Sequence, residues 1–281
     1  MTRGWTGRTP QSGWPDAKGA LKRYFEGEYP MRTKFVLCLS AAAAALASAT
    51  PAAAHDLGGG FAINGGATVV SDYRFRGISQ TDRRFAVQGT LSLSHSSGFY
   101  ATIWGSSIDD YVAGGSDQEI DFVVGWKRTY GNTTVDVGVL YYYYPGGETL
   151  IPGLDTDFFE PYVSVSQAVG PVTLKATANY APSQSALSIG AGNEDNLYLA
   201  GDVSASLGHG FTVSGHLGHS FGPSYLTIGD GYTDWNVGVS YTTGPLTLGV
   251  QYVDTDATAL SPINARNISG SGVVASVGVA F

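Results

Sequence analysis

Four arginines lie close together in the segment SDYRFRGISQTDRRFAVQG, which spans residues 71–89. They are Arg74, Arg76, Arg83 and Arg84, and the chain beyond residue 54 contains only four other lysines and arginines. A guanidinium group carries a planar fork of N–H donors that matches carboxylate and phosphate groups equally well. The cluster therefore predicts one of two roles. It either presents positive charge to passing anions, or it is held by acidic side chains or by lipid phosphates.

A histidine and a serine raise the question of hydrolase chemistry. His216 and Ser220 would share one face of a strand, but four residues of extended chain separate them by roughly 13 Å. His219 and Ser220 are neighbours and would point to opposite faces. A base and its nucleophile must lie about 2.6–3.2 Å apart, so neither pair assembles without a cross-strand partner. Hydrolase activity is a remote alternative, and we expect no enzyme.

Acidic loops raise the question of a metal site. Two Asp-Thr-Asp segments, at residues 155–157 and 254–256, could offer oxygen ligands to calcium. Solvated acidic loops are the commoner explanation for such segments, so we predict no metal site. The glycine-containing segments GAGNED and GDGYTD precede no helix and do not form phosphate-binding loops. We therefore expect no cofactor.

The elements that would position these residues are strands. Leu246, Leu248, Val250 and Tyr252 alternate with smaller or polar residues, and such alternation is typical of strands with one apolar and one polar face. No segment beyond residue 54 shows a sustained helical period. We predict twelve strands, at residues 61–75, 85–95, 98–107, 117–128, 132–143, 157–168, 171–180, 194–207, 211–221, 232–243, 245–254 and 270–281.

The connections between these strands alternate between long and short. Five are tight turns, such as Gly170–Pro171 and Gly244–Pro245, and six are longer loops rich in Asp, Gly, Pro and Ser. Transmembrane β-barrels have an even strand number, short periplasmic turns and long extracellular loops. They must close, because an open edge in lipid leaves backbone groups unpaired. The pattern predicts an all-β, antiparallel transmembrane barrel of about twelve strands with both termini in the periplasm.

This fold would place charged strand residues in the lumen, because a charge on the lipid face costs about 2–4 kcal/mol at the membrane midplane. Small inward residues such as Ser166, Thr173 and Ser240 would leave space there. Aromatic residues near strand ends, among them Tyr141 to Tyr144 and Phe158, would form the interfacial girdles. The first long loop would bring the four arginines to the pore mouth. The predicted lumen-lining residues are Glu119, Asp121, Lys127, Asp136, Glu160, Lys175, Asp202, His216 and Asp234.

The N-terminal segment is predicted not to belong to the mature protein. From Met31, a basic start, an apolar run over residues 35–47 and Ala52–Ala53–Ala54 form a signal peptide at residues 31–54. Residues 1–30 would be an upstream extension, and residues 55–281 the barrel. The first 54 residues hold 7 of the 15 basic and 3 of the 23 acidic side chains, so the barrel carries 8 basic and 20 acidic ones. This acidic excess argues against nucleic-acid binding.

The C-terminus resembles the insertion signal of bacterial outer-membrane barrels. The chain ends as SGVVASVGVAF, so that Phe281 closes an alternating last strand and shares a face with Val277 and Val279. We predict that Phe281 is recognised by the barrel-assembly machinery. A soluble β-sandwich that ends in Phe by chance is the alternative, and the signal peptide and loop pattern disfavour it.

The segment from Ser71 to Asp109 resembles the N-terminal signature of the proteobacterial TorF-like porin family. Its Y-R-F-R-G-x-S-x-T motif matches Tyr73–Thr81, its A-V-Q-G motif matches Ala86–Gly89, and its G-F-Y-x-x-x-W motif matches Gly98–Trp104. The detailed match covers about forty residues, and beyond Ile108 the similarity is one of pattern and length. The resemblance implies an outer-membrane channel and names no substrate.

Together these observations predict a narrow channel for small hydrophilic solutes in the bacterial outer membrane. Its surroundings would be outer-membrane lipid and lipopolysaccharide. A non-conducting barrel used for adhesion or membrane integrity is the alternative from another class. Twelve strands lie between barrels of about 8 strands, which side chains fill, and porins of about 16, which are open. The strand number alone therefore does not decide between the two.

Overall fold

The computed structural model describes residues 54–149, 153–189, 192–227 and 229–281, so the predicted extension and nearly all of the predicted signal peptide lie outside the described residues. The wall of the molecule is a single antiparallel sheet. Its strands are β2 (Phe61–Val70), β5 (Ala86–His95), β6 (Phe99–Ser107), β7 (Gln118–Tyr130), β8 (Thr133–Tyr143), β9 (Phe158–Val169), β10 (Val172–Gln184), β11 (Glu194–Gly208), β12 (Phe211–Phe221), β13 (Tyr232–Thr243), β14 (Leu246–Thr255) and β15 (Gly272–Ala280).

The sheet closes on itself. Each of these strands pairs with its neighbours in sequence, and β15 pairs with β2 through Ser276–Ala280 and Gly66–Val70. A short strand β1 (His55–Gly58) pairs with residues 61–63 of β2, before the part of β2 that pairs with β15. It is not one of the twelve strands that form the closed wall. The predicted twelve-stranded antiparallel barrel is confirmed. Strand bounds agree within a few residues, except that the first strand leaves the wall after Val70 instead of at residue 75.

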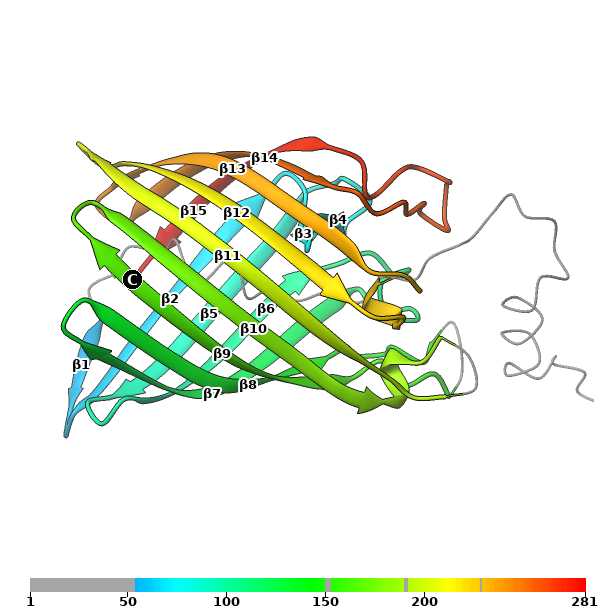
Figure 1. Cartoon of the computed structure of the whole chain (residues 1–281), viewed down its shortest axis with the longest axis horizontal. Helices are drawn as coiled ribbons and strands as arrows, with labels where there is room; N and C mark the ends of the chain where they lie inside the picture. Colours follow the sequence, from blue (N-terminus) through cyan, green and yellow to red (C-terminus); the bar gives the residue numbers. More distant parts are fainter. Residues whose placement is uncertain (1–53, 150–152, 190–191, 228) are drawn as a thin grey trace, which may run out of the picture.

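The two ends of the barrel differ, as Figure 1 shows. Five connections of two or three residues lie at one end, here called the turn end, and six long connections lie at the other, the loop end. Phe281 lies at the turn end, where its backbone N–H and C=O each form a 2.9 Å hydrogen bond with Gly65. Which end faces the periplasm stays a prediction.

The outer surface is apolar over the middle of the wall. Outward side chains such as Val124, Leu217 and Val237 are about 60% exposed, although a water-soluble protein rarely exposes a continuous apolar surface of this kind. Alternation explains the pattern, because every second residue of each strand must point outward. Among the described residues, no helix is long and apolar enough to cross a membrane.

The interior changes character along the barrel axis. Toward the loop end it holds a hydrophobic cluster to which the long connections contribute, for example through Ile108, Leu187 and Ile268. Tyr142, Tyr144 and Phe158 also belong to this cluster and are at most 2% exposed. The expectation that these three rings form a lipid-facing girdle is wrong, because their parity along β8 and β9 directs them inward. Tyr141 and Tyr143 do point outward and are 42% and 40% exposed.

Barrel closure is testable at the last residue. Deletion of Phe281 is expected to reduce the amount of folded barrel, because it removes both hydrogen bonds that extend the β15–β2 pairing to Gly65. Phe281→Ala keeps these bonds and loses only the ring that lies against Gly65, so its effect should be in the same direction and smaller. The readout is the heat-modifiable folded band on gels of outer-membrane fractions. Phe211→Ala, another outward aromatic at the turn end, is the control, and a deletion with unchanged folded protein would contradict the role of Phe281.

Candidate functional site

The first long connection folds into the barrel. Two short strands, β3 (Arg74–Phe75) and β4 (Ile78–Ser79), pair as a hairpin, called here the inner hairpin, at the loop end (Figure 1). Its two turn residues, Arg76 and Gly77, have φ of 42° and 83°, as a type I′ hairpin turn requires. Phe75 and Ile78 are 1% and 2% exposed and belong to the interior cluster. The hairpin therefore occupies part of the cross-section.

Arg76 at the hairpin tip spans the interior. Its Nη2 donates to Glu160 Oε1 on β9 at 2.7 Å, and its Nη1 donates to Asn196 Oδ1 on β11 at 3.0 Å. In the ring of twelve strands, β9 and β11 flank β10, which lies opposite β2. A non-glycine residue at positive φ is uncommon and strained. The contacts with the opposite wall keep Arg76 in this conformation.

The pair formed by Arg76 and Glu160 is fully enclosed. The guanidinium carbon lies 4.7 Å from the ring centre of Phe75 and 4.0 Å from that of Tyr198. The other Glu160 oxygen accepts hydrogen bonds from Tyr142 at 3.1 Å and Asn179 at 3.0 Å. Burial acts against the charge of Arg76, but Glu160 outweighs it and raises the pKa of Arg76 above its usual value. The hairpin tip thus stays cationic and its charge is compensated.

A second polar cluster lies beside the first, on β11 to β13. His216 Nδ1 is 2.7 Å from Asp202 Oδ1, and His216 Nε2 is 3.2 Å from Asp234 Oδ1. The Tyr198 hydroxyl lies 2.9 Å from His216 Nε2. Both ring nitrogens of His216 therefore face carboxylates or Tyr198, and among the described residues no serine hydroxyl bonds to this ring. The hydrolase alternative gains nothing from this geometry.

The remaining predicted pore-mouth arginines lie at the loop end. Arg74 pairs with Asp72 at 2.6 Å and donates to the Gly77 and Gly270 carbonyls. Arg83 donates to Gly270 O at 2.6 Å, and Arg84 pairs with Asp109. The side chain of Arg74 is 3% exposed and that of Arg84 is 62% exposed. The sequence cluster thus divides into Arg76 inside the barrel, buried Arg74, and Arg83 and Arg84 nearer the surface.

The other predicted lumen residues lie at different depths. Glu119 and Asp121 on β7 are buried at 0% and 1% exposure, and Glu119 accepts long hydrogen bonds from Tyr73. Lys127 and Asp136 pair at 3.1 Å toward the turn end, where Tyr100 donates to the same carboxylate. Lys175 lies directly opposite Asp202 in the β10–β11 register and is partly exposed.

The turn half of the interior is lined by small polar side chains, and we call it the vestibule. The predicted inward residues Thr173, Thr177, Ser166, Ser204, Ser206, Gly238 and Ser240 are all partly or fully exposed there, whereas Ser164 is buried. Small side chains leave space that water can enter. The interior thus combines a vestibule of partly exposed, small polar side chains at the turn end with a region at the loop end where the inner hairpin and the hydrophobic cluster pack.

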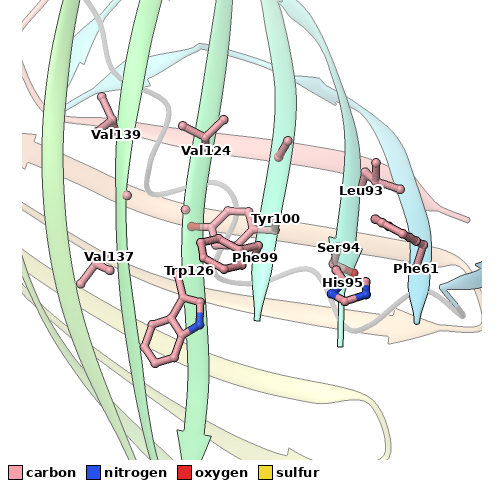
Figure 2. Close-up of a pocket in the computed structure, with 13 residues that line it drawn as sticks. Phe61, Leu93, Ser94, His95, Phe99, Tyr100, Val124, Trp126, Val137 and Val139 are labelled. Carbon is pink, nitrogen blue, oxygen red and sulfur yellow. The ribbon is translucent and has the colours of Figure 1, made fainter. Parts of the chain in front are cut away.

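A depression of about 690 Å³ lies elsewhere, on the wall near the turn end. Figure 2 shows Phe61, Leu93, Phe99, Val124 and Trp126 among its lining residues. Most of these side chains are apolar, point outward and are exposed. The depression therefore faces lipid and does not form a solute site in the lumen.

Sequence reasoning missed the uncharged partners of Arg76 and Glu160. Arg76 contacts Asn196 and the ring of Tyr198. Glu160 accepts hydrogen bonds from Tyr142 and Asn179. Strand parity could have found Tyr198, because it lies four residues from the predicted inward Asp202 and so on the same face. No comparable signal links the hairpin to strands that lie 84 and 120 residues away along the chain.

Solved structures with a similar fold are outer-membrane barrels. The NanC porin matches 78% of this chain and 98% of its own, with a TM-score of 0.52 and 16% sequence identity. The KdgM porin, solved in complex with disordered oligogalacturonate, matches 78% of this chain and 97% of its own at a TM-score of 0.49 and 10% identity. An outer-membrane channel from Pseudomonas putida F1 matches 83% of this chain and 98% of its own, with a TM-score of 0.46 and 12% sequence identity. At these identities the likeness to NanC shows a shared fold and nothing more.

Residues 53–281 match the profile of the family described as "Bacterial protein of unknown function (Gcw_chp)". The match covers most of the sequence and all of the barrel, so the chain belongs to this family. No curated protein sequence matches the chain.

The buried pair is testable by stability. Glu160→Ala is expected to lower the free energy of unfolding by roughly 3–5 kcal/mol, because it leaves Arg76 buried without its counter-charge. The double variant Arg76→Met/Glu160→Leu should recover much of this loss, since no buried charge remains. The measurement is urea unfolding of the barrel refolded into lipid vesicles. Lys127→Met removes the exposed pair with Asp136 and should cost no more than about 1 kcal/mol. A Glu160→Ala effect of that small size would contradict the proposed importance of the buried pair.

Proposed function

We propose that this member of the Gcw_chp family is an outer-membrane porin, a narrow channel for small hydrophilic solutes. One observation carries the proposal, namely a closed barrel that is apolar outside and contains a vestibule lined by partly exposed serine and threonine. Any closed barrel in lipid has a polar interior, but the small side chains of the vestibule leave space along the axis, as a solute path requires. Solutes from outside the cell would pass the inner hairpin, which occupies part of the cross-section at the loop end, and then reach the vestibule at the turn end.

The charges along this path favour cations. At the hairpin, the positive charge of Arg76 is compensated by Glu160, so it offers little to a passing anion. The predicted lumen-lining set contains six carboxylates against two lysines and one histidine. Lys127 is itself paired with Asp136. The main role of the arginines in this proposal is therefore to hold the hairpin in place. The acidic wall would give the channel a modest preference for cations.

The proposed location follows from the same features. The apolar wall requires lipid, and the predicted signal peptide at residues 31–54 would direct the chain out of the cytoplasm. The TorF-like resemblance supports this assignment, because it implies an outer-membrane channel. The motif that carries it, from Tyr73 to Thr81, contains the whole inner hairpin. Phe281 would present the last strand to the barrel-assembly machinery, and the loop end would face lipopolysaccharide.

A non-conducting barrel remains the second candidate, and the packed loop end favours it. Tyr73, Phe75 and Tyr142 pack with other rings inside the barrel at the level of the hairpin. If this packing blocks ions permanently, the vestibule would be open only at the turn end. The protein would then serve membrane integrity or adhesion.

Planar-bilayer recording of the purified protein separates the two candidates. We expect small single-channel steps for the wild type and larger steps when residues 74–79 are replaced by two glycines, because the hairpin narrows the path. Arg84→Ala, at the exposed rim, should conduct like the wild type. A wild type that never conducts in any salt, while the shortened variant does, would establish a closed barrel.

The same recordings test selectivity. In a salt gradient the reversal potential should show a cation preference, and the variant with Arg74, Arg76, Arg83 and Arg84 all changed to alanine should strengthen it. A wild type that prefers anions and loses this preference in the variant would return the arginines to an anion-selecting role.

The orientation is tested by proteolysis of intact cells. Protease is expected to cut within residues 145–156, 181–193 or 255–269, which overlap three of the long connections, and to spare the tight turns at 131–132 and 170–171. Permeabilised cells are the control for access to both faces. Cuts restricted to the turns would invert the proposed topology.

A further inference from the structure

Positive charge at the loop end is confined to one side of the barrel. Of the six long connections, only those at 71–85 and 256–271 contain lysine or arginine, and the other four contain none. These two connections are neighbours in space because β14, β15, β2 and β5 are adjacent in the sheet. The exposed members are Arg84 and Arg266, whose side chains are 62% and 49% exposed.

Contacts between the two connections build this side into a unit. Arg266 Nη1 donates to Asp82 O at 2.7 Å, Asn264 Nδ2 donates to Asp82 Oδ2 at 2.7 Å, and Arg83 Nη2 donates to Gly270 O at 2.6 Å. We call Arg83, Arg84, Phe85 and Arg266 the basic sector.

The basic sector keeps a surplus of charge and of donors. Arg74, Arg84 and Arg266 each pair with one carboxylate, those of Asp72, Asp109 and Asp82 respectively. Among the described residues Arg83 forms no ion pair, and burial lowers its pKa. Among the described residues, Arg266 donates only through Nη1, and Nη1 of Arg84 has no hydrogen-bond partner. Guanidinium groups in this state match the oxygens of a phosphate.

An apolar surface lies next to these donors. Phe85 follows Arg84 directly and is 75% exposed, the largest exposure among the large hydrophobic side chains of the described residues. Val87 on the outer face of β5 is 64% exposed. An aromatic ring at the boundary between the apolar wall and the polar connections occupies the position typical of the membrane interface. The guanidinium groups lie at the level where lipid headgroups would be.

The rest of the loop end would repel a phosphate. Three outward tyrosines donate to carboxylates there, namely Tyr141 to Asp157 at 3.3 Å, Tyr180 to Asp195 at 2.8 Å and Tyr252 to Asp254 at 3.1 Å. Asp157 and Asp195 lie in other sectors, around β8–β9 and β10–β11, and Asp254 lies on β14 at the edge of the basic side. A phosphorylated lipid would therefore find one favourable position around the rim.

We propose that the basic sector binds the phosphate groups of lipid A, with its acyl chains lying against Phe85 and Val87. The inference rests on the proposed function, because it needs the loop end in the outer leaflet. It assigns Arg84 and Arg266 to phosphate binding and Phe85 to the acyl chains. The number of tightly bound lipid A molecules is one per barrel.

Native mass spectrometry of the purified barrel with lipid A tests the proposal. Arg84→Gln/Arg266→Gln is expected to weaken binding by on the order of tenfold for each arginine, and Phe85→Ala should weaken it less. Asp109→Asn frees Arg84 from its ion pair and should tighten binding, an outcome that misfolding does not produce. Arg128→Gln removes an exposed arginine at the turn end and is the matched control.

Competition experiments identify the source of the phosphate. Dephosphorylated lipid A should bind weakly, and inorganic phosphate and phosphatidylglycerol should compete poorly with lipid A. Equal competition by phosphatidylglycerol would reduce the site to a general anionic-lipid contact and overturn the assignment to lipid A. Unchanged binding in the double arginine variant, or an equal loss in Arg128→Gln, would overturn the site itself. Conductance recorded from the same samples reports on the channel separately, so failure of one proposal is distinguishable from failure of the other.

Discussion

The need to pair every backbone N–H and C=O in lipid governs this structure. A sheet edge exposed to hydrocarbon would leave a row of these groups unsatisfied, at a cost of several kcal/mol for each. The pairing of β15 with β2, continued by Phe281 and Gly65, removes that edge. Once the wall is closed, strand alternation divides each strand into an outer and an inner set of side chains. The apolar surface, the vestibule and the inward polar clusters all follow from this division.

The inner hairpin shows how a closed wall permits charge inside a membrane protein. Within the barrel, Arg76 meets Glu160, the Asn196 amide and two aromatic rings, so its charge is compensated within the protein. Such a pair contributes little net stability, because desolvation offsets most of the attraction. Its value lies in position: a guanidinium that reaches the opposite wall fixes the hairpin at one height. The positive φ of the non-glycine residue Arg76 is the cost of that placement.

How far the sequence predicts the structure depends on the range of the interactions. Period-two alternation extends over whole strands, and loop length separates the two ends, so twelve strands and their closure are predictable. The inner hairpin is not, since strands of two residues carry no periodicity, and its partners on β9 and β11 are far away in sequence. The tyrosines of β8 illustrate the intermediate case. Composition placed Tyr142 in a girdle, whereas counting parity from an outward neighbour such as Val139 would have placed it inside.

The opening cluster of arginines serves two environments through the same chemistry. A guanidinium fork accepts a carboxylate or a phosphate with similar geometry, and burial decides which of them is within reach. Arg76 and Arg74 are enclosed with carboxylates of the chain, whereas Arg84 and Arg266 also pair with carboxylates but keep further donors at the surface. A barrel with 8 basic and 20 acidic residues beyond residue 54 would repel anions on average. Concentrating its arginines in one connection lets the same segment close the interior and leave a single positive position on an otherwise acidic rim.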